Sequence, residues 1–153
     1  MGRGVERDAH CGTKVQHRWD AIRRPWRSNL RQVHLLQTEL LDEVNAKGFG
    51  VQPGNLGENV STRGINLLAL PTGTHLHLGS ETILRITGLR TPCAQINKFR
   101  KGLLEAVLER RVGASLISKT GVMSVVIRGG HVRPDDGITV HLPDGPHIAL
   151  KAV

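Results

Sequence analysis

The sequence has few of the residues that build disulfide frameworks, aromatic binding platforms or membrane spans. Its 153 residues include two cysteines, two tryptophans, two phenylalanines and no tyrosine. Two cysteines far apart in the chain exclude a disulfide-rich scaffold, and they cannot supply the four ligands of an iron–sulfur cluster. No apolar run approaches the roughly 20 residues of a membrane-spanning helix, and no signal peptide is recognisable. We therefore expect a single domain with a cytoplasmic location and no membrane partner.

Acidic residues are also scarce, which leaves a formal net charge of +8 from 21 Lys and Arg against 13 Asp and Glu. Such a balance can attract nucleic acid, anionic lipid or a phosphorylated small ligand. Much of the charge lies early in the chain, up to Arg31. Proteins that bind single-stranded nucleic acid interleave their charge with aromatic side chains, and these are nearly absent here. Nucleic acid is therefore disfavoured as a partner, and a solvated basic face is the commonest explanation.

Several catalytic and nucleotide-binding motifs are absent. There is no Gly-x-Ser-x-Gly elbow, no P-loop and no Gly-x-Gly-x-x-Gly sequence, which excludes the sites built on those motifs. Residues 8–11 (Asp-Ala-His-Cys) have metal-binding side chains, but no second pair of ligands with matching spacing follows. His75 and His77 share one face of a predicted strand, where they could bind a metal, although histidines in such positions more often face solvent.

Short strands dominate the pattern of apolar residues. Residues 1–30 are basic and weakly patterned, and we predict that they are irregular. The periodicity then predicts helices through 36–44, stopping at Lys47 and Gly48, and through 103–108, with one helical turn at 67–70. It predicts a strand beginning at Val33 and further strands at 74–79, 82–87, 122–127, 137–142 and 148–153. Many short strands with Gly- and Pro-rich turns and few short helices are typical of a closed β-barrel with helical decoration.

Cys93 is the most informative single residue. Thr91 is a good N-cap and Pro92 a favoured first helical residue, so we expect Cys93 in the first turn of a helix. Free N–H groups there favour a thiolate, and Arg90 adds positive charge nearby. Such a thiol could hold a metal, attack an electrophile or carry sulfur. The alternative is that Cys93 is a small buried core residue, as cysteines often are.

A second candidate is the glycine-containing loop Gly54–Asn59. Glycines at 54 and 57 permit positive φ and a close approach of the backbone to a ligand. The side chains of Glu58 and Asn59 can hydrogen-bond a heterocycle. The alternative is a hairpin or barrel corner in which Glu58 caps neighbouring amides.

These pieces, in this order, resemble a MOSC domain, the module named after the C-terminal part of molybdenum cofactor sulfurase. The resemblance runs from about Gly4 to the C-terminus, and the Gly-Glu-Asn and Pro-Cys pieces are its most specific parts. The matching segments are Gly54–Asn59, Gly64–Gly73, Leu76–Gly79, Thr87–Cys93, Lys119–Met123 and Gly129–Asp136.

The resemblance implies one MOSC domain over residues 1–153, of the stand-alone bacterial type, with a closed β-barrel of the pyruvate-kinase β-barrel type. It implies binding of molybdenum cofactor (molybdopterin) and reduction of N-hydroxylated or N-oxygenated small molecules, with electrons from a separate redox protein. Cys93 would be the catalytic residue and the molybdenum ligand, which suits a soft thiolate. The cofactor-binding residues would be Gly57, Glu58, Asn59, Arg90 and His10, with Lys119 or the basic N-terminal segment at the phosphate.

The N-terminal element departs from the family pattern. Members usually have a strand before a Gly-x-x-Gly-Asp-x-His-x-Gly element, whereas here the element begins at Gly4, and Arg7 replaces its second glycine. A missing leading strand would leave a barrel edge open unless residues 13–30 or a second copy in a homodimer covered it. Two other functions stay open: a sulfur carrier with a persulfide on Cys93, and a non-enzymatic anion- or nucleic-acid-binding barrel in which Cys93 is structural.

Overall fold

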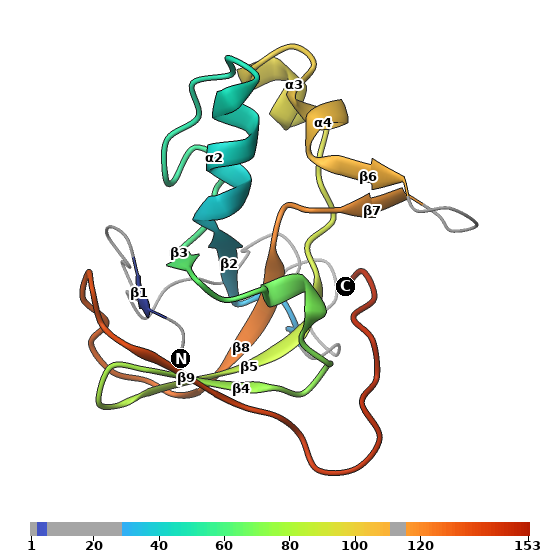
Figure 1. The fold of residues 1–153 in the computed structure, drawn as a ribbon. Helices are drawn as coiled ribbons and strands as arrows, with labels where there is room; N and C mark the ends of the chain where they lie inside the picture. The colour runs from blue at the N-terminus through green and yellow to red at the C-terminus, as the bar shows by residue number, and fades with distance from the viewer. Residues whose placement is uncertain (1–2, 6–28, 111–115) are drawn as a thin grey trace.

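One strongly curled sheet forms most of the computed structural model, which describes residues 3–5, 29–110 and 116–153 (Figure 1). Seven strands hydrogen-bond in the order β1-β3-β2-β8-β5-β4-β9, and β6 and β7 form a separate ribbon. The pairs are antiparallel except for β2 with β3. The strands are β1 (Arg3–Val5), β2 (Val33–Gln37), β3 (Val60–Arg63), β4 (His75–Leu78), β5 (Thr82–Leu89), β6 (Leu108–Arg110), β7 (Leu116–Ser118), β8 (Val122–Arg128) and β9 (Ile138–His141).

The helices in the described ranges are short. They are α2 (Thr38–Ala46), the 3-10 turn η1 (Leu67–Ala69), α3 (Gln95–Phe99) and α4 (Leu103–Ala106). Figure 1 shows α2, α3 and α4 together at one end of the sheet, with the β6–β7 ribbon beside them. None of the helices in the described ranges has the length and apolar character needed to cross a membrane.

The expectation of a mainly β fold with short helices is confirmed, but closure of the barrel is not. The sheet ends at β1 on one side and at β9 on the other, and no backbone pairing joins these two strands in the described part of the chain. The strand β1 has three residues and its register against β3 shifts within them, so it offers little ladder on which a further strand could pair. The sheet is therefore a curled, open half-barrel. The strand β1 itself lies within residues 1–30, for which the sequence predicts irregular structure.

Alternation along β2 divides the interior into two hydrophobic cores. Successive side chains of a strand point to opposite faces. Val33 and Leu35 point into the curl of the sheet, and Leu36 points toward the helices. The sheet core consists of Val33, Leu35, Val60, Ile65, Leu67, Leu76, Leu78, Leu84, Ile86, Val122, Val132 and Ile138. The helical core consists of Leu36, Leu40, Leu41, Val44, Val51, Leu56, Ile96, Leu103 and Val107.

The helix predicted through residues 103–108 is shorter than expected. The helix α4 ends at Ala106, and Leu108 begins the strand β6, which pairs with β7. The N–H of Lys119 donates to the carbonyl of Val107 at 2.8 Å, so the hydrogen bonding of the β6–β7 ribbon begins at Val107. The helical preference indicated by the spacing of the apolar residues is thus outweighed by strand pairing with a partner that the local pattern does not reveal.

The strand predicted at 148–153 is also wrong. The C-terminal segment makes only an isolated bridge between Ala152 and Leu89. The strand β4 pairs with β5 only over Thr82–Arg85, so the edge of Leu89 is free, and Leu89 donates to the carbonyl of Lys151 at 2.8 Å and accepts the N–H of Val153 at 3.3 Å. The segment packs where the register of β5 against β8 shifts, and the Gly88 backbone has no side chain to exclude the carbonyl of Lys151. Because β5 ends at Leu89, the pairing stops at this single bridge.

Candidate functional site

Cys93 lies in the loop between β5 and α3 and is exposed. The helix α3 begins at Gln95 with Ala94 as its N-cap, so the prediction that Thr91 caps a helix containing Cys93 is wrong. The carbonyl of Cys93 accepts the N–H of Ile96 at 3.1 Å, which makes Cys93 the residue that starts a tight turn rather than one inside the helix. Its thiol faces the Gln95 side chain, with Sγ 3.8 Å from Oε1. The alternative of a buried core cysteine is therefore also wrong.

Arg90 lies just before this loop and is half-buried. Its backbone N–H donates to the carbonyl of Gly121, which fixes it beside the start of β8. Burial lowers the pKa of Arg90, while the neighbouring Cys93 and Glu58 side chains raise it and the neighbouring Arg31 lowers it. The Nη1 atom of Arg90 is buried and has no hydrogen-bond partner among the described residues. The guanidinium thus contacts the cysteine and still has a donor available.

The loop containing Gly57, Glu58 and Asn59 packs against the same guanidinium. Gly57 has φ +79°, and a Cβ placed on it would lie 4.0 Å from Nη2 of Arg90. One oxygen of Glu58, Oε1, accepts the N–H of Gly54 at 2.6 Å, as the capping alternative expects. The other oxygen, Oε2, is buried without a partner. Glu58 therefore both fixes its loop and has an acceptor available beside Arg90.

Asn59 fastens this loop to β2. Its Oδ1 accepts the backbone N–H of His34 at 2.8 Å, and its own N–H donates to the carbonyl of His34 at 2.9 Å. The ring of the buried His34 in turn lies 2.6 Å from the carbonyl of Thr120, measured from Nε2. Because Thr120 contacts Arg90 through its hydroxyl, His34 links the Asn59 loop to the segment that carries Arg90. No local sequence pattern connects these residues, which lie far apart along the chain.

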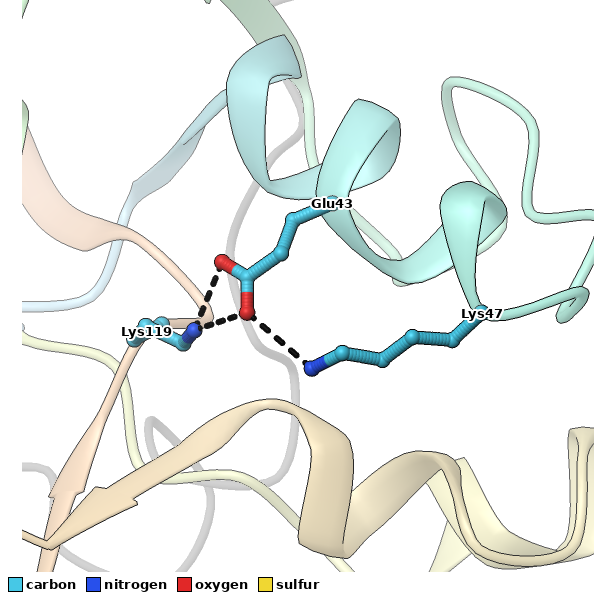
Figure 2. Close-up of polar contacts among 3 residues, drawn as sticks. All are labelled: Glu43, Lys47 and Lys119. Atoms are coloured by element: carbon cyan, nitrogen blue, oxygen red, sulfur yellow. Dashed lines mark hydrogen bonds and ion pairs between the residues drawn. The ribbon is translucent and has the colours of Figure 1, made fainter.

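Lys119 is near this group but is already paired. Figure 2 shows its Nζ donating to both oxygens of Glu43 on α2, at 2.6 and 2.7 Å, with Lys47 on the other side at 3.2 Å. The hydrogen bond from Lys119 is the main cause that lowers the pKa of Glu43; burial opposes it, and Lys47 lowers it further. The side chain of Lys119 is 16% exposed. Its donors therefore serve the attachment of α2 to the β7–β8 connection.

One predicted site residue lies outside the described ranges, and one residue that was not predicted joins the site. His10, together with Cys11, falls outside the described residues. Arg31, which the sequence marks only as part of a basic segment, lies close enough to Arg90 to lower its pKa, and its buried Nε has no partner. Arg31 is thus a member of the site that composition alone could not single out.

The residues that do meet form a hydrogen-bonding, cationic environment around one thiol. Arg90, which lies beside Cys93, has Arg31 and Glu58 as further neighbours, and among the described residues each of the three has a buried polar side-chain atom without a partner. Leaving such atoms without partners costs free energy, which a polar anionic ligand would recover. Across the residues that the structure describes, no three His, Cys, Asp or Glu side chains converge as a protein-only metal site. The arrangement fits an anionic cofactor that brings its own metal and accepts one thiolate.

A hollow of about 720 Å³ lies elsewhere on the molecule, at the β4–β5 turn. Its polar lining includes Glu81, His131, Arg133 and Asp136. None of the predicted site residues contributes to it, so its size is no argument for the chemistry of Cys93.

Comparison with known proteins gives a family and a fold. The sequence matches the family model for the MOSC domain over residues 23–139. No curated protein matches the sequence. Similar solved structures include YiiM from Geobacillus stearothermophilus, with a TM-score of 0.60 and 14% identity, and YiiM from Escherichia coli, with 0.55 and 20%. The YuaD protein from Bacillus subtilis is similar with a TM-score of 0.62 and 23% identity.

The extent of these matches differs. The match to the two YiiM structures covers 78% and 77% of this chain but 58% of each YiiM chain. The match to YuaD covers 94% of this chain and 87% of YuaD. The chain thus spans little more than half the length of the YiiM proteins, and identities this low show a common fold.

Proposed function

The chain belongs to the MOSC domain family, and we propose that it binds molybdenum cofactor through Cys93 and acts as a reductase of N-hydroxylated small molecules. The family is associated with molybdenum cofactor binding. One observation carries the proposal for this chain: the exposed Cys93 thiol lies against Arg90, whose guanidinium also faces Glu58 and the Gly57 backbone. These residues come from two loops more than thirty positions apart in the sequence.

Each residue has a role that its surroundings support. The Cys93 thiolate would ligate molybdenum, because a soft sulfur ligand suits a polarisable metal. The unpaired donors of Arg90 and Arg31 would hold the phosphate, since guanidinium groups match phosphate oxygens in charge and geometry. The free Oε2 of Glu58 would accept N–H groups of the pterin. Lys119 stays a predicted phosphate contact only, and its pairing with Glu43 disfavours that role.

Asn59 and Gly57 would support the cofactor indirectly. Asn59 uses its Oδ1 on His34, which holds the loop at a fixed distance from β2. Gly57 lacks a side chain, so the pterin could approach the backbone beside Arg90. Held this way, the loop would need little rearrangement when the cofactor binds, which reduces the entropic cost of binding.

The reaction requires an external partner. When bound, the cofactor supplies a metal centre that accepts and delivers electron pairs. Cleavage of an N–O bond to give N–H and water consumes two electrons and two protons. The two cysteines of the sequence cannot hold an iron–sulfur cluster, so a separate redox protein would supply the electrons. The exposed setting of Cys93 would leave room for a small-molecule substrate.

A second candidate function uses the same thiol. The exposure of Cys93 and its contact with Arg90 also suit a sulfur carrier, in which the thiolate bears a persulfide that is passed to an acceptor. This function needs no metal, so metal content distinguishes the two.

The test is elemental analysis of molybdenum in protein expressed in cells with intact cofactor synthesis. We expect near-stoichiometric molybdenum in the wild type, loss in Cys93→Ser, and retention in the control Cys11→Ser. Reduction of an amidoxime with an artificial electron donor should follow the molybdenum content. A wild-type protein without molybdenum but with a persulfide on Cys93 would replace the reductase with the sulfur carrier.

A further inference from the structure

Three histidines gather on the outer face of the sheet, on strands that carry none of the candidate site residues around Cys93. His75 and His77 alternate with buried leucines along β4 and so project to the same side. His141 on the terminal strand β9 is paired in register with His75. The rings of His77 and His141 lie diagonally across the two strands, with centroids 4.3 Å apart and planes tilted by 42°.

We propose that His77 and His141 form a binding site for a divalent transition-metal ion that favours imidazole ligands, such as Ni²⁺, Cu²⁺ or Zn²⁺. Two imidazoles on one metal, with bonds of about 2.0–2.1 Å, have ring centres about 4.5–5 Å apart. The observed distance of 4.3 Å between the two ring centres is slightly shorter, and a small rotation of the histidine side chains would make up the difference. Because no three metal-binding side chains converge in the part of the chain described here, water would complete the coordination.

The lowered pKa of His77 favours metal binding near neutral pH. Metals bind neutral imidazole, so a proton competes with the metal for each ring. Burial lowers the pKa of His77, and His141, His75 and Arg128 lower it further. Arg85 adds a cation on the β5 side, since it pairs in register with His75. These positive neighbours disfavour a bound metal ion as well as a bound proton. The metal ion, however, gains a bond to each of two nitrogens, whereas a proton is bound to one.

The position of the site gives it a structural consequence. The strand β9 has four residues, and in the part of the chain that the structure describes its only sheet partner is β4. A metal bridging His77 and His141 would link this terminal strand to its neighbour through side chains. A ligand that binds the folded state and not the unfolded one raises the unfolding temperature.

The test is calorimetric titration of the whole chain with Ni²⁺ at pH 7.5, with both cysteines kept reduced by a non-chelating phosphine. His77→Gln and His141→Gln should each weaken binding by about tenfold or more, since each removes one ligand. His131→Gln and His147→Gln remove exposed histidines outside the pair and should leave the affinity unchanged. Thermal unfolding without metal shows that each variant is folded.

Two further readouts make the outcome decisive. Ni²⁺ should raise the unfolding temperature of the wild type but not of His141→Gln, and binding should fall as the pH drops through the imidazole range. Equal affinity in the wild type and both ligand variants would overturn the proposal, as would a wild-type Kd weaker than about 1 mM. Equal weakening in the two control variants would also overturn it.

Discussion

Two cations lie on neighbouring segments beside the cysteine loop, Arg90 after the end of β5 and Lys119 just before β8, and their surroundings differ. Lys119 donates to both oxygens of Glu43. Arg90 is half-buried, and its Nη1 has no partner. Since an unpaired buried donor costs free energy in the absence of a ligand, only Arg90 has something to gain from binding an anion. Both side chains are cations, so charge does not distinguish a ligand-binding residue from a structural one. The difference is that a ligand-binding cation still has a hydrogen-bond donor without a partner.

The largest expected effect comes from disturbing Gly121, whose backbone holds that of Arg90 beside the start of β8. Gly121 accepts the N–H of Arg90 and has φ +88°. A Cβ at this position would overlap the carbonyl oxygen of Leu35 and crowd Nε2 of His34. We expect Gly121→Ala to lower the free energy of unfolding by about 3 kcal/mol or more, measured by urea denaturation.

The matched control for this substitution is Gly145→Ala. Gly145 has φ +85°, and a Cβ there would meet no atom within 4 Å. It should therefore cost only the backbone strain of a left-handed conformation, about 1–2 kcal/mol. Equal losses in the two variants would show that the contacts around Gly121 do not matter.

Removal of the Lys119 amine should have a smaller effect on stability. Lys119→Met breaks the ion pair with Glu43, which is partly exposed, and we expect a loss of about 1 kcal/mol at pH 7. The folded-state pKa of Glu43 is lowered from its ordinary 4.5, so the pair stabilises the protein above that pH and loses its effect as the pH falls through the folded pKa. Urea denaturation at pH 7 should separate wild type from Lys119→Met, and the difference should shrink below about pH 4.5. A difference that grows in acid would contradict this.

The smallest effect should come from the other partner of Glu43. Lys47 lies one helical turn away, and its side chain is 52% exposed. Exposed pairs at this spacing contribute about 0.3–0.5 kcal/mol, so Lys47→Gln should lower stability by no more than that. The loss should vanish in high salt, because solvent-exposed charges are screened. A loss as large as that of Lys119→Met would mean that burial does not distinguish the two lysines.

Local patterns predicted much of the fold. Alternation along residues 75–78 and the helical spacing of Leu40 and Val44 correspond to β4 and α2, because burial of one face imposes those periods directly. The helix predicted from residue 36 begins only at Thr38, because Leu36 belongs to the strand β2. The patterns failed where a distant partner decided the outcome. Leu108 joins a strand because Ser118 pairs with it, and the C-terminal segment makes a single bridge to Leu89 because β5 ends there.

The site was predictable in its residue types and less so in its contacts. The resemblance to the family pointed to Cys93, Arg90 and Glu58, and the structure brings them together. The partner of Lys119 could not be read from the sequence, because Glu43 lies 76 residues away on a different element. The role of Arg31 was hidden for a similar reason, since only the fold places it beside Arg90.

The measurement that tests the comparison most directly is the molybdenum content and unfolding temperature of Arg90→Met and Lys119→Met, each expressed with intact cofactor synthesis. Arg90→Met removes a buried charge with an unpaired donor, so molybdenum should be lost while the unfolding temperature of the metal-free protein stays unchanged or rises. Lys119→Met should retain molybdenum and unfold at a lower temperature. Loss of molybdenum in Lys119→Met with retention in Arg90→Met would contradict the assignment of Arg90 as the cation that binds the cofactor.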